Sequence, residues 1–254
     1  MTRRRTVRPI GLALGQVLVR YCDQGGNERL VAAADAVRLR FEDGLPVRDI
    51  PSYAGQQHTP GELWFATSDR FLAYESYLES KWMKLLDFDP DVADLVAQPF
   101  ELEGRDQGGV WRHTPDLFAR LGDGTVRLLD VKANRFLPHL DVTRQRIRTA
   151  AVCEAMGWDY EMVGEPDPLR WESVKWLAGY RRPSLAADEL AAPLLELAAH
   201  PVTIGDLLAF QSAPDIARAV VYHLMWHHRL AFDITKPLRD HTPVWSRPAP
   251  ETRP

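Results

Sequence analysis

Apolar side chains in the first half of the chain follow a helical spacing at first and a strand-like spacing afterwards. Residues 74–90 place their apolar side chains on one helical face, which ends near Pro90. A second helix is predicted over 141–157, where Gly157 suits the C-terminal cap. Four segments are predicted to be β-strands: 94–104, 110–121, 125–132 and 158–164. This order predicts an α/β fold in which helices flank a mixed sheet.

The second half of the chain is predicted to be a small, mainly helical domain. Its apolar spacing indicates three short helices, over 187–200, 203–211 and 213–229. An alternating segment around Lys236-Pro237 predicts a closing hairpin over 229–245. Short helices closed by a hairpin are the outline of a winged-helix domain.

These patterns predict that the chain is divided into three parts. Residues 1–73 form an N-terminal extension with a hairpin signal at Asp23-Gln24-Gly25-Gly26. The α/β domain occupies 74–182, and the winged-helix-like domain occupies 183–254.

Composition and charge limit the classes of protein to which the chain can belong. The chain has 254 residues, 45% hydrophobic and 26% charged, which is the balance of a globular protein with a real core. No apolar run approaches the roughly 20 residues of a membrane span, so we expect no membrane partner. Two cysteines fit a reducing cytoplasm. Because the net charge is −4, any nucleic-acid binding must come from local patches.

One basic patch stands out in the first half. It holds a single acid, Asp141, among four candidate DNA-binding side chains: Arg135, Arg144, Arg146 and Arg148. Such a cluster can grip phosphates. A solvated helix surface is the alternative interpretation.

The candidate chemistry is spread over 79–132. Asp130 and Lys132 share a strand face because side chains repeat every two positions. Asp116 on the neighbouring antiparallel strand can reach that face, and Glu79 on the preceding helix adds a third carboxylate. Carboxylates that converge with a lysine suit Mg²⁺-dependent phosphodiester hydrolysis. Taken separately, each motif is more often a turn or a surface ion pair.

The order of these motifs is more restrictive than any one of them, and it is the PD-(D/E)xK arrangement of restriction-endonuclease-like proteins. The chain resembles TnsA, the endonuclease subunit of heteromeric transposases, over about 74–245. The motifs that carry the resemblance are Ser76-x-x-Glu79, Asp87-Phe88-Asp89-Pro90, Gln98-Pro99, His113-x-Pro115-Asp116 and Asp130-Val131-Lys132. Similar features follow at Gly157-Trp158-x-Tyr160 and 177–182.

The resemblance implies a catalytic set of Glu79, Asp116, Asp130 and Lys132. Together with the strand geometry, it suggests that the three acids and the Val131 carbonyl hold Mg²⁺ or Mn²⁺. Glu75 is the reserve for Glu79, and the candidate supporting residues are Gln98 and His113. The implied partners are double-stranded DNA at transposon ends, a DDE-type transposase subunit and an AAA+ ATPase regulator. The implied location is the bacterial cytoplasm, at the nucleoid when the protein is active.

Two other functions stay open at this point. One is a stand-alone PD-(D/E)xK nuclease of a restriction or defence system, and the other is a catalytically silent adaptor that holds DNA and proteins. A zinc site at His223, His227 and His228 is disfavoured, because their spacing offers no obvious third ligand and lacks the glutamate of a zinc-protease helix.

Overall fold

The computed structural model describes residues 16–47, 60–209 and 211–247, and these form two compact units. The first unit comprises the described residues up to Met83 together with Asp91–Glu165. The second comprises Lys84–Pro90 and the described residues from Pro166 onward. The three-part division predicted from the sequence differs from this arrangement at both boundaries. Strands from the N-terminal segment belong to the first unit, and a helix before residue 182 belongs to the second.

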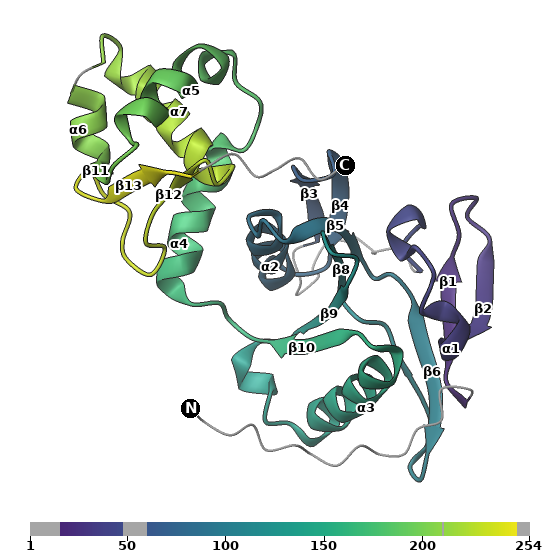
Figure 1. Ribbon diagram of the computed structural model, residues 1–254. Helices are drawn as coiled ribbons and strands as arrows, with labels where there is room; N and C mark the ends of the chain where they lie inside the picture. Colours follow the sequence, from purple (N-terminus) through teal and green to yellow (C-terminus); the bar gives the residue numbers. More distant parts are fainter. Residues whose placement is uncertain (1–15, 48–59, 210, 248–254) are drawn as a thin grey trace. The chain divides into compact units, whose positions relative to one another are not determined.

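A four-stranded mixed sheet carries the candidate chemistry of the first unit (Figure 1). Its order is β10-β9-β8-β5, and its strands are β5 (Val92–Ala97), β8 (Leu117–Leu121), β9 (Val126–Val131) and β10 (Asp159–Val163). β9 and β10 run parallel, whereas the other pairs are antiparallel. The crossover from β9 to β10 contains α3 (Leu140–Met156), which lies along β10 and ends at Gly157 with φ of 72°. The mixed α/β class predicted from the sequence is confirmed.

A second sheet in the same unit is entirely antiparallel. Its order is β2-β1-β6-β7, and its strands are β1 (Leu18–Cys22), β2 (Glu28–Ala32), β6 (Glu101–Asp106) and β7 (Gly109–His113). A separate hairpin consists of β3 (Gly61–Phe65) and β4 (Arg70–Tyr74).

Two segments that were each predicted to be a single strand are each divided into two strands. The segment 94–104 is divided at Pro99 into β5 and β6, and the segment 110–121 is divided at Pro115 into β7 and β8. Proline lacks the N–H that a sheet ladder needs, so each segment breaks there. The two halves then enter different sheets.

Aromatic side chains form the core of the first unit. Phe41 lies in the short 3₁₀ helix η2 (Phe41–Asp43), which follows α1 (Ala33–Ala36). Its ring centroid lies 4.6 Å from that of Phe100, 5.5 Å from that of Phe118 and 6.1 Å from that of Trp158. The packing therefore joins the N-terminal segment to the mixed sheet.

A buried ion pair makes the same connection beside this core. The Glu42 side chain is buried, and its oxygens accept hydrogen bonds from Arg120 of β8 at 3.0 and 3.2 Å. We expect Glu42→Ala to lower the free energy of unfolding by about 3 kcal/mol, because it leaves the Arg120 guanidinium without its buried partner. Denaturant titration measures this change.

The matched control is Glu28→Ala, which removes an exposed partner of Arg20. Exposed ion pairs contribute little, so this variant should unfold within about 1 kcal/mol of the wild type. Equal losses in the two variants would contradict the importance of the Glu42 pair.

The second unit is built around α7 (Pro214–Trp226). The elements before α7 are α4 (Pro168–Leu177), η4 (Ala178–Tyr180), α5 (Leu185–Leu197), β11 (Val202–Thr203) and α6 (Ile204–Ala209). After it come β12 (Leu230–Ala231) and β13 (Pro243–Ser246), which complete a small sheet of order β11-β13-β12. The three predicted helices are present as α5, α6 and α7. Across the described ranges, no helix has the length and apolar character that crossing a membrane requires.

Helix α4 was not predicted from the sequence. Asp167 accepts a hydrogen bond from the Arg170 N–H at 2.9 Å, and Pro168 occupies the first turn. Both features are ordinary signals of a helix start. α4 contacts α7, which explains why the second unit begins before the predicted boundary.

Candidate functional site

The first candidate carboxylate lies at the start of α2 (Tyr77–Asp87). Glu79 is buried, and its Oε1 accepts a hydrogen bond from the Ser76 hydroxyl at 2.7 Å. Its Oε2 accepts the Glu75 N–H at 2.9 Å, and the Ser76 hydroxyl in turn accepts the Glu79 N–H at 3.2 Å. This reciprocal cap fixes the Glu79 side chain in the first turn. Glu75, the reserve for Glu79, precedes the helix.

Asp116 and Asp130 face each other across two strands. The register of β8 and β9 pairs Leu117 with Leu129, and one further step places Asp116 opposite Asp130. Directly opposed residues of this kind have Cβ atoms about 5 Å apart. Asp116 Oδ2 also accepts the Val131 N–H at 2.7 Å, which holds its carboxylate against the end of β9.

The charges of the other three predicted catalytic side chains all act on Asp116. Burial raises the pKa of Asp116 well above its usual range, and the negative charges of Asp130 and Glu79 raise it further. The Val131 N–H and the positive charge of Lys132 act in the opposite direction. The structure therefore places Asp130, Glu79 and Lys132 close enough to Asp116 for their charges to act on it.

Asp130 has a different environment from Asp116. Its side chain is only 1% exposed, and the His113 Nε2 atom lies 2.8 and 2.9 Å from its two oxygens. The Tyr160 hydroxyl donates to Oδ2 at 2.7 Å, and the Gln145 Nε2 atom lies 3.5 Å from the same oxygen. His113, predicted as a supporting residue, thus contacts a carboxylate of the site.

Gln145 and Tyr160 were not predicted as site residues, although both have a periodic signal. Gln145 is one helical turn from buried Thr149 and two from buried Val152, so it lies on the inner face of α3. Tyr160 is paired with Leu128 in the parallel register, and Leu128 shares its strand face with Asp130. Identifying these two residues required the strand partner as well as the spacing.

Gln98 supports the site through its backbone. Its N–H donates to the Asp116 carbonyl at 2.9 Å, and its own carbonyl accepts the Val47 N–H at 3.1 Å. Gln98 is buried and has φ of 49°, an uncommon backbone conformation for a residue other than glycine. Hydrogen bonds on both sides hold this turn next to Asp116.

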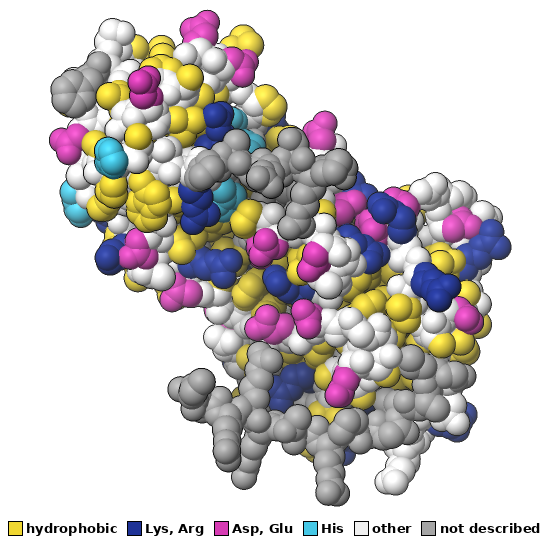
Figure 2. Space-filling model, viewed as in Figure 1, with side chains coloured by type: hydrophobic (Ala, Val, Ile, Leu, Met, Phe, Trp, Pro, Cys, Tyr) yellow, Lys and Arg dark blue, Asp and Glu magenta, His cyan; other side chains and the backbone are white. Residues whose placement is uncertain are grey.

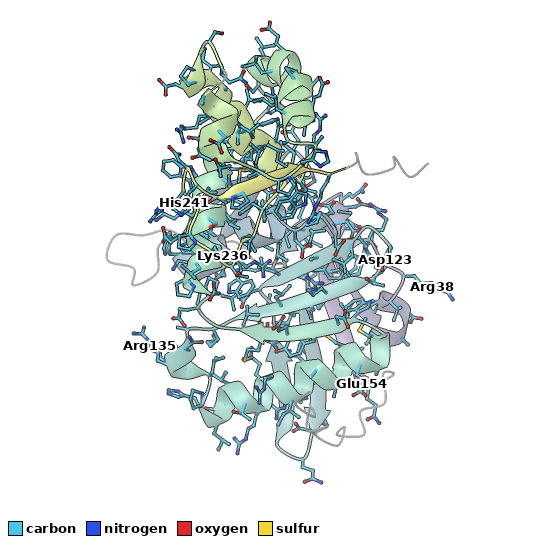
Figure 3. All side chains as sticks on the ribbon, turned by 60° about the vertical axis from the view of Figure 1, so that its left-hand side comes forward. Arg38, Asp123, Arg135, Glu154, Lys236 and His241 are labelled. Atoms are coloured by element: carbon cyan, nitrogen blue, oxygen red, sulfur yellow. The ribbon has the colours of Figure 1, made fainter. Side chains whose placement is uncertain are left out.

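The predicted basic patch is only partly available to a ligand. Arg148 donates to Asp106 at 2.7 Å and lies over the Trp111 ring, so it has a packing role. Arg135, Arg144 and Arg146 are exposed, and Figure 3 shows Arg135 pointing away from the sheet. On the face shown in Figure 2, basic and acidic side chains are interspersed.

The chemistry of the donor set fits a hard divalent cation. Asp116 and Asp130 supply carboxylate oxygens, and their mutual repulsion is the kind that a bound cation relieves. Among the residues that the structure describes, no three His, Cys, Asp or Glu side chains are grouped so that they could hold a metal ion. Mg²⁺ commonly binds through one or two carboxylates and keeps several waters, so the fit does not require a third acid.

Two of the three histidines considered for zinc contact backbone carbonyls in the second unit. His223 Nδ1 lies 2.8 Å from the Tyr180 carbonyl, and His228 Nε2 lies 2.6 Å from the Phe88 carbonyl. A carbonyl only accepts, so each of these ring nitrogens donates a proton.

No protein-family model matches the chain, and no curated protein matches it either.

Proposed function

We propose that the chain is a Mg²⁺-dependent DNA endonuclease subunit of the TnsA type, which cleaves the 5′ ends of a mobile element during cut-and-paste transposition. The observation that carries this proposal is the position of Asp116, whose Oδ2 accepts the Val131 N–H at 2.7 Å between Asp130 and Lys132. The order of the sequence motifs supports the same assignment.

In this proposal each residue of the site has a separate task. Asp116 and Asp130 bind Mg²⁺ or Mn²⁺ together with the Val131 carbonyl, and Glu79 adds negative charge from the start of α2. When bound, the ion polarises the scissile phosphate and makes water more acidic. Lys132 provides a fixed positive charge for the phosphate or for the attacking water.

The surface around α3 suits a phosphate backbone. Arg144 and Arg146 are exposed on this helix, and Arg135 is exposed in the short 3₁₀ helix η3 (Asn134–Phe136) that precedes it. Contacts of this kind give affinity without sequence readout. We therefore assign to these three arginines the DNA-binding role that was predicted for four.

From α5 onward, the second unit has three helices with a strand after the first and two strands at the end, an order that supports a winged-helix assignment. In such domains the third helix commonly enters the major groove. Here most of α7 is buried, including Val221, Leu224 and Met225, and α4, α5 and α6 all contact it. We propose that this unit docks the ATPase regulator, while the DDE-type subunit cuts the 3′ ends.

A reconstituted cleavage assay tests the proposal. The full chain is combined with a DDE-type transposase subunit, an AAA+ ATPase regulator and DNA that carries the labelled ends of the element. We expect cleavage of the 5′ strand only with Mg²⁺ or Mn²⁺, and its loss in Asp130→Asn. The control is Glu154→Gln, which changes an exposed acid on the outer face of α3 (Figure 3).

The other outcomes of this assay identify the competing functions. DNA cleavage that is equally fast without any partner would favour a stand-alone restriction or defence nuclease. Stable assembly with both partners and no metal-dependent cleavage of either strand by this chain would favour an adaptor. Either result would contradict the proposed function.

A further inference from the structure

The Asp130 carboxylate is held from three separate elements. His113 closes β7 of the antiparallel sheet, Tyr160 lies on β10 of the mixed sheet, and Gln145 lies on α3. Segments that are distant in the sequence therefore converge on one side chain that is almost completely inaccessible to solvent. Burying a carboxylate costs free energy unless hydrogen bonds satisfy its oxygens, and these side chains supply such bonds.

His113 and Tyr160 both contact the Asp130 carboxylate at hydrogen-bond distance. The His113 Nε2 atom lies within 2.9 Å of both oxygens, and we assign the ring proton to this nitrogen because it faces the carboxylate. The Tyr160 hydroxyl donates to Oδ2 at 2.7 Å. Gln145 Nε2 lies 3.5 Å from Oδ2 and 3.1 Å from His113 Nε2, so Gln145 contacts the histidine more closely than the carboxylate.

These donors occupy the two oxygens unequally. A carboxylate has about four acceptor positions, two on each oxygen. Oδ2 receives both His113 and Tyr160, whereas His113 is the only donor to Oδ1 among the described residues. The arrangement therefore fixes the carboxylate plane and leaves acceptor capacity on Oδ1.

We propose that His113 and Tyr160 are positioning residues, which hold the Asp130 carboxylate in the orientation in which Oδ1 can bind a divalent cation. This inference rests on the proposed function, because it assigns the cation to the same site. Carboxylates that bind metals are usually oriented by such hydrogen bonds, and loss of one weakens metal binding about 10- to 100-fold. Asp116 has a backbone N–H in the corresponding place.

Direct measurement of Mn²⁺ binding to the full chain tests the role without any cleavage assay. The electron paramagnetic resonance signal of free Mn²⁺ reports the dissociation constant for wild type, Tyr160→Phe, His113→Ala and His113→Gln. We expect Tyr160→Phe and His113→Ala to bind Mn²⁺ about 10- to 100-fold more weakly. His113→Gln should recover most of the affinity, because its amide provides a new N–H donor.

The matched controls are Tyr21→Phe and His139→Gln, which change the same residue types in the first unit away from Asp130. Thermal unfolding without metal accompanies each titration, so that an affinity loss is read only from variants that remain folded. If wild type binds Mn²⁺ and all His113 and Tyr160 variants bind it equally well, the positioning role is overturned while the proposed function stands. If wild type binds no Mn²⁺, the proposed function fails as well.

Discussion

Lys132→Ala should lower the rate of 5′-strand cleavage about 10²–10³-fold while the chain stays folded and continues to join its partners. Lys132 lies at the end of β9, where its N–H donates to the Val163 carbonyl at 2.8 Å, so the backbone holds the residue without its ammonium group. Its positive charge acts on Asp116 in the centre of the site. Removing that charge deletes stabilisation that matters most in the transition state.

Strand-specific labelling measures this effect directly. In the reconstituted complex, 3′-end joining by the transposase should continue while the 5′ ends stay attached to the donor DNA. Lys175→Ala is the matched control, because Lys175 is an exposed lysine on α4 with one weak ion pair to Glu172. Normal 5′ cleavage by Lys132→Ala would show that the assignment of Asp130-Val131-Lys132 is wrong.

Asp116→Asn should have two opposite effects: loss of metal binding and higher stability of the metal-free protein. The pKa of Asp116 is raised by burial and by Asp130 and Glu79, so its ionisation favours the unfolded chain, in which these costs are absent. Asparagine keeps an oxygen to accept the Val131 N–H and carries no charge. We therefore expect a rise of a few degrees in the thermal unfolding midpoint at alkaline pH.

The sign of the pH dependence distinguishes this explanation from better packing. A raised folded-state pKa for an acid means that stability is lost as the pH rises through that value. The advantage of Asp116→Asn should accordingly vanish at acidic pH, where Asp116 is protonated in the folded and the unfolded states. Scanning calorimetry at several pH values, with exposed Asp159→Asn as control, measures the difference.

Addition of Mn²⁺ gives the complementary result. A ligand that binds only the folded state raises its stability, so wild type should gain stability with Mn²⁺ while Asp116→Asn should not. Equal stabilisation of both proteins by Mn²⁺ would place the bound ion elsewhere.

Local patterns predicted the parts of the site that depend on neighbouring residues. Helix α3 and its Gly157 cap follow the spacing, and a tight turn at Gly122-Asp123-Gly124 separates β8 from β9. The facing of Asp116 and Asp130 also follows from strand alternation across that turn. These features involve few residues, and each has a strong local signal.

Other parts depend on pairings that no local pattern contains. Pro99 and Pro115 were visible, but only the sheet order shows that the chain changes sheets at these points. Arg148 belongs to a cluster of arginines that is typical of a DNA contact, yet it donates a hydrogen bond to Asp106 on a distant hairpin. Tyr160 reaches Asp130 because β10 pairs parallel to β9, which requires the whole α3 crossover.

The changes of sheet at Pro99 and Pro115 have a consequence for how the first unit folds. Along the chain, β6 and β7 of one sheet lie between β5 and β8 of the other, and β5 lies between β2 and β6, so neither sheet is a continuous stretch of sequence. A partly folded form with one sheet intact would have to leave the intervening strands of the other as open loops, at a large entropic cost. We therefore expect both sheets to form in one cooperative step, limited in speed by the distant pairing of β1 with β6.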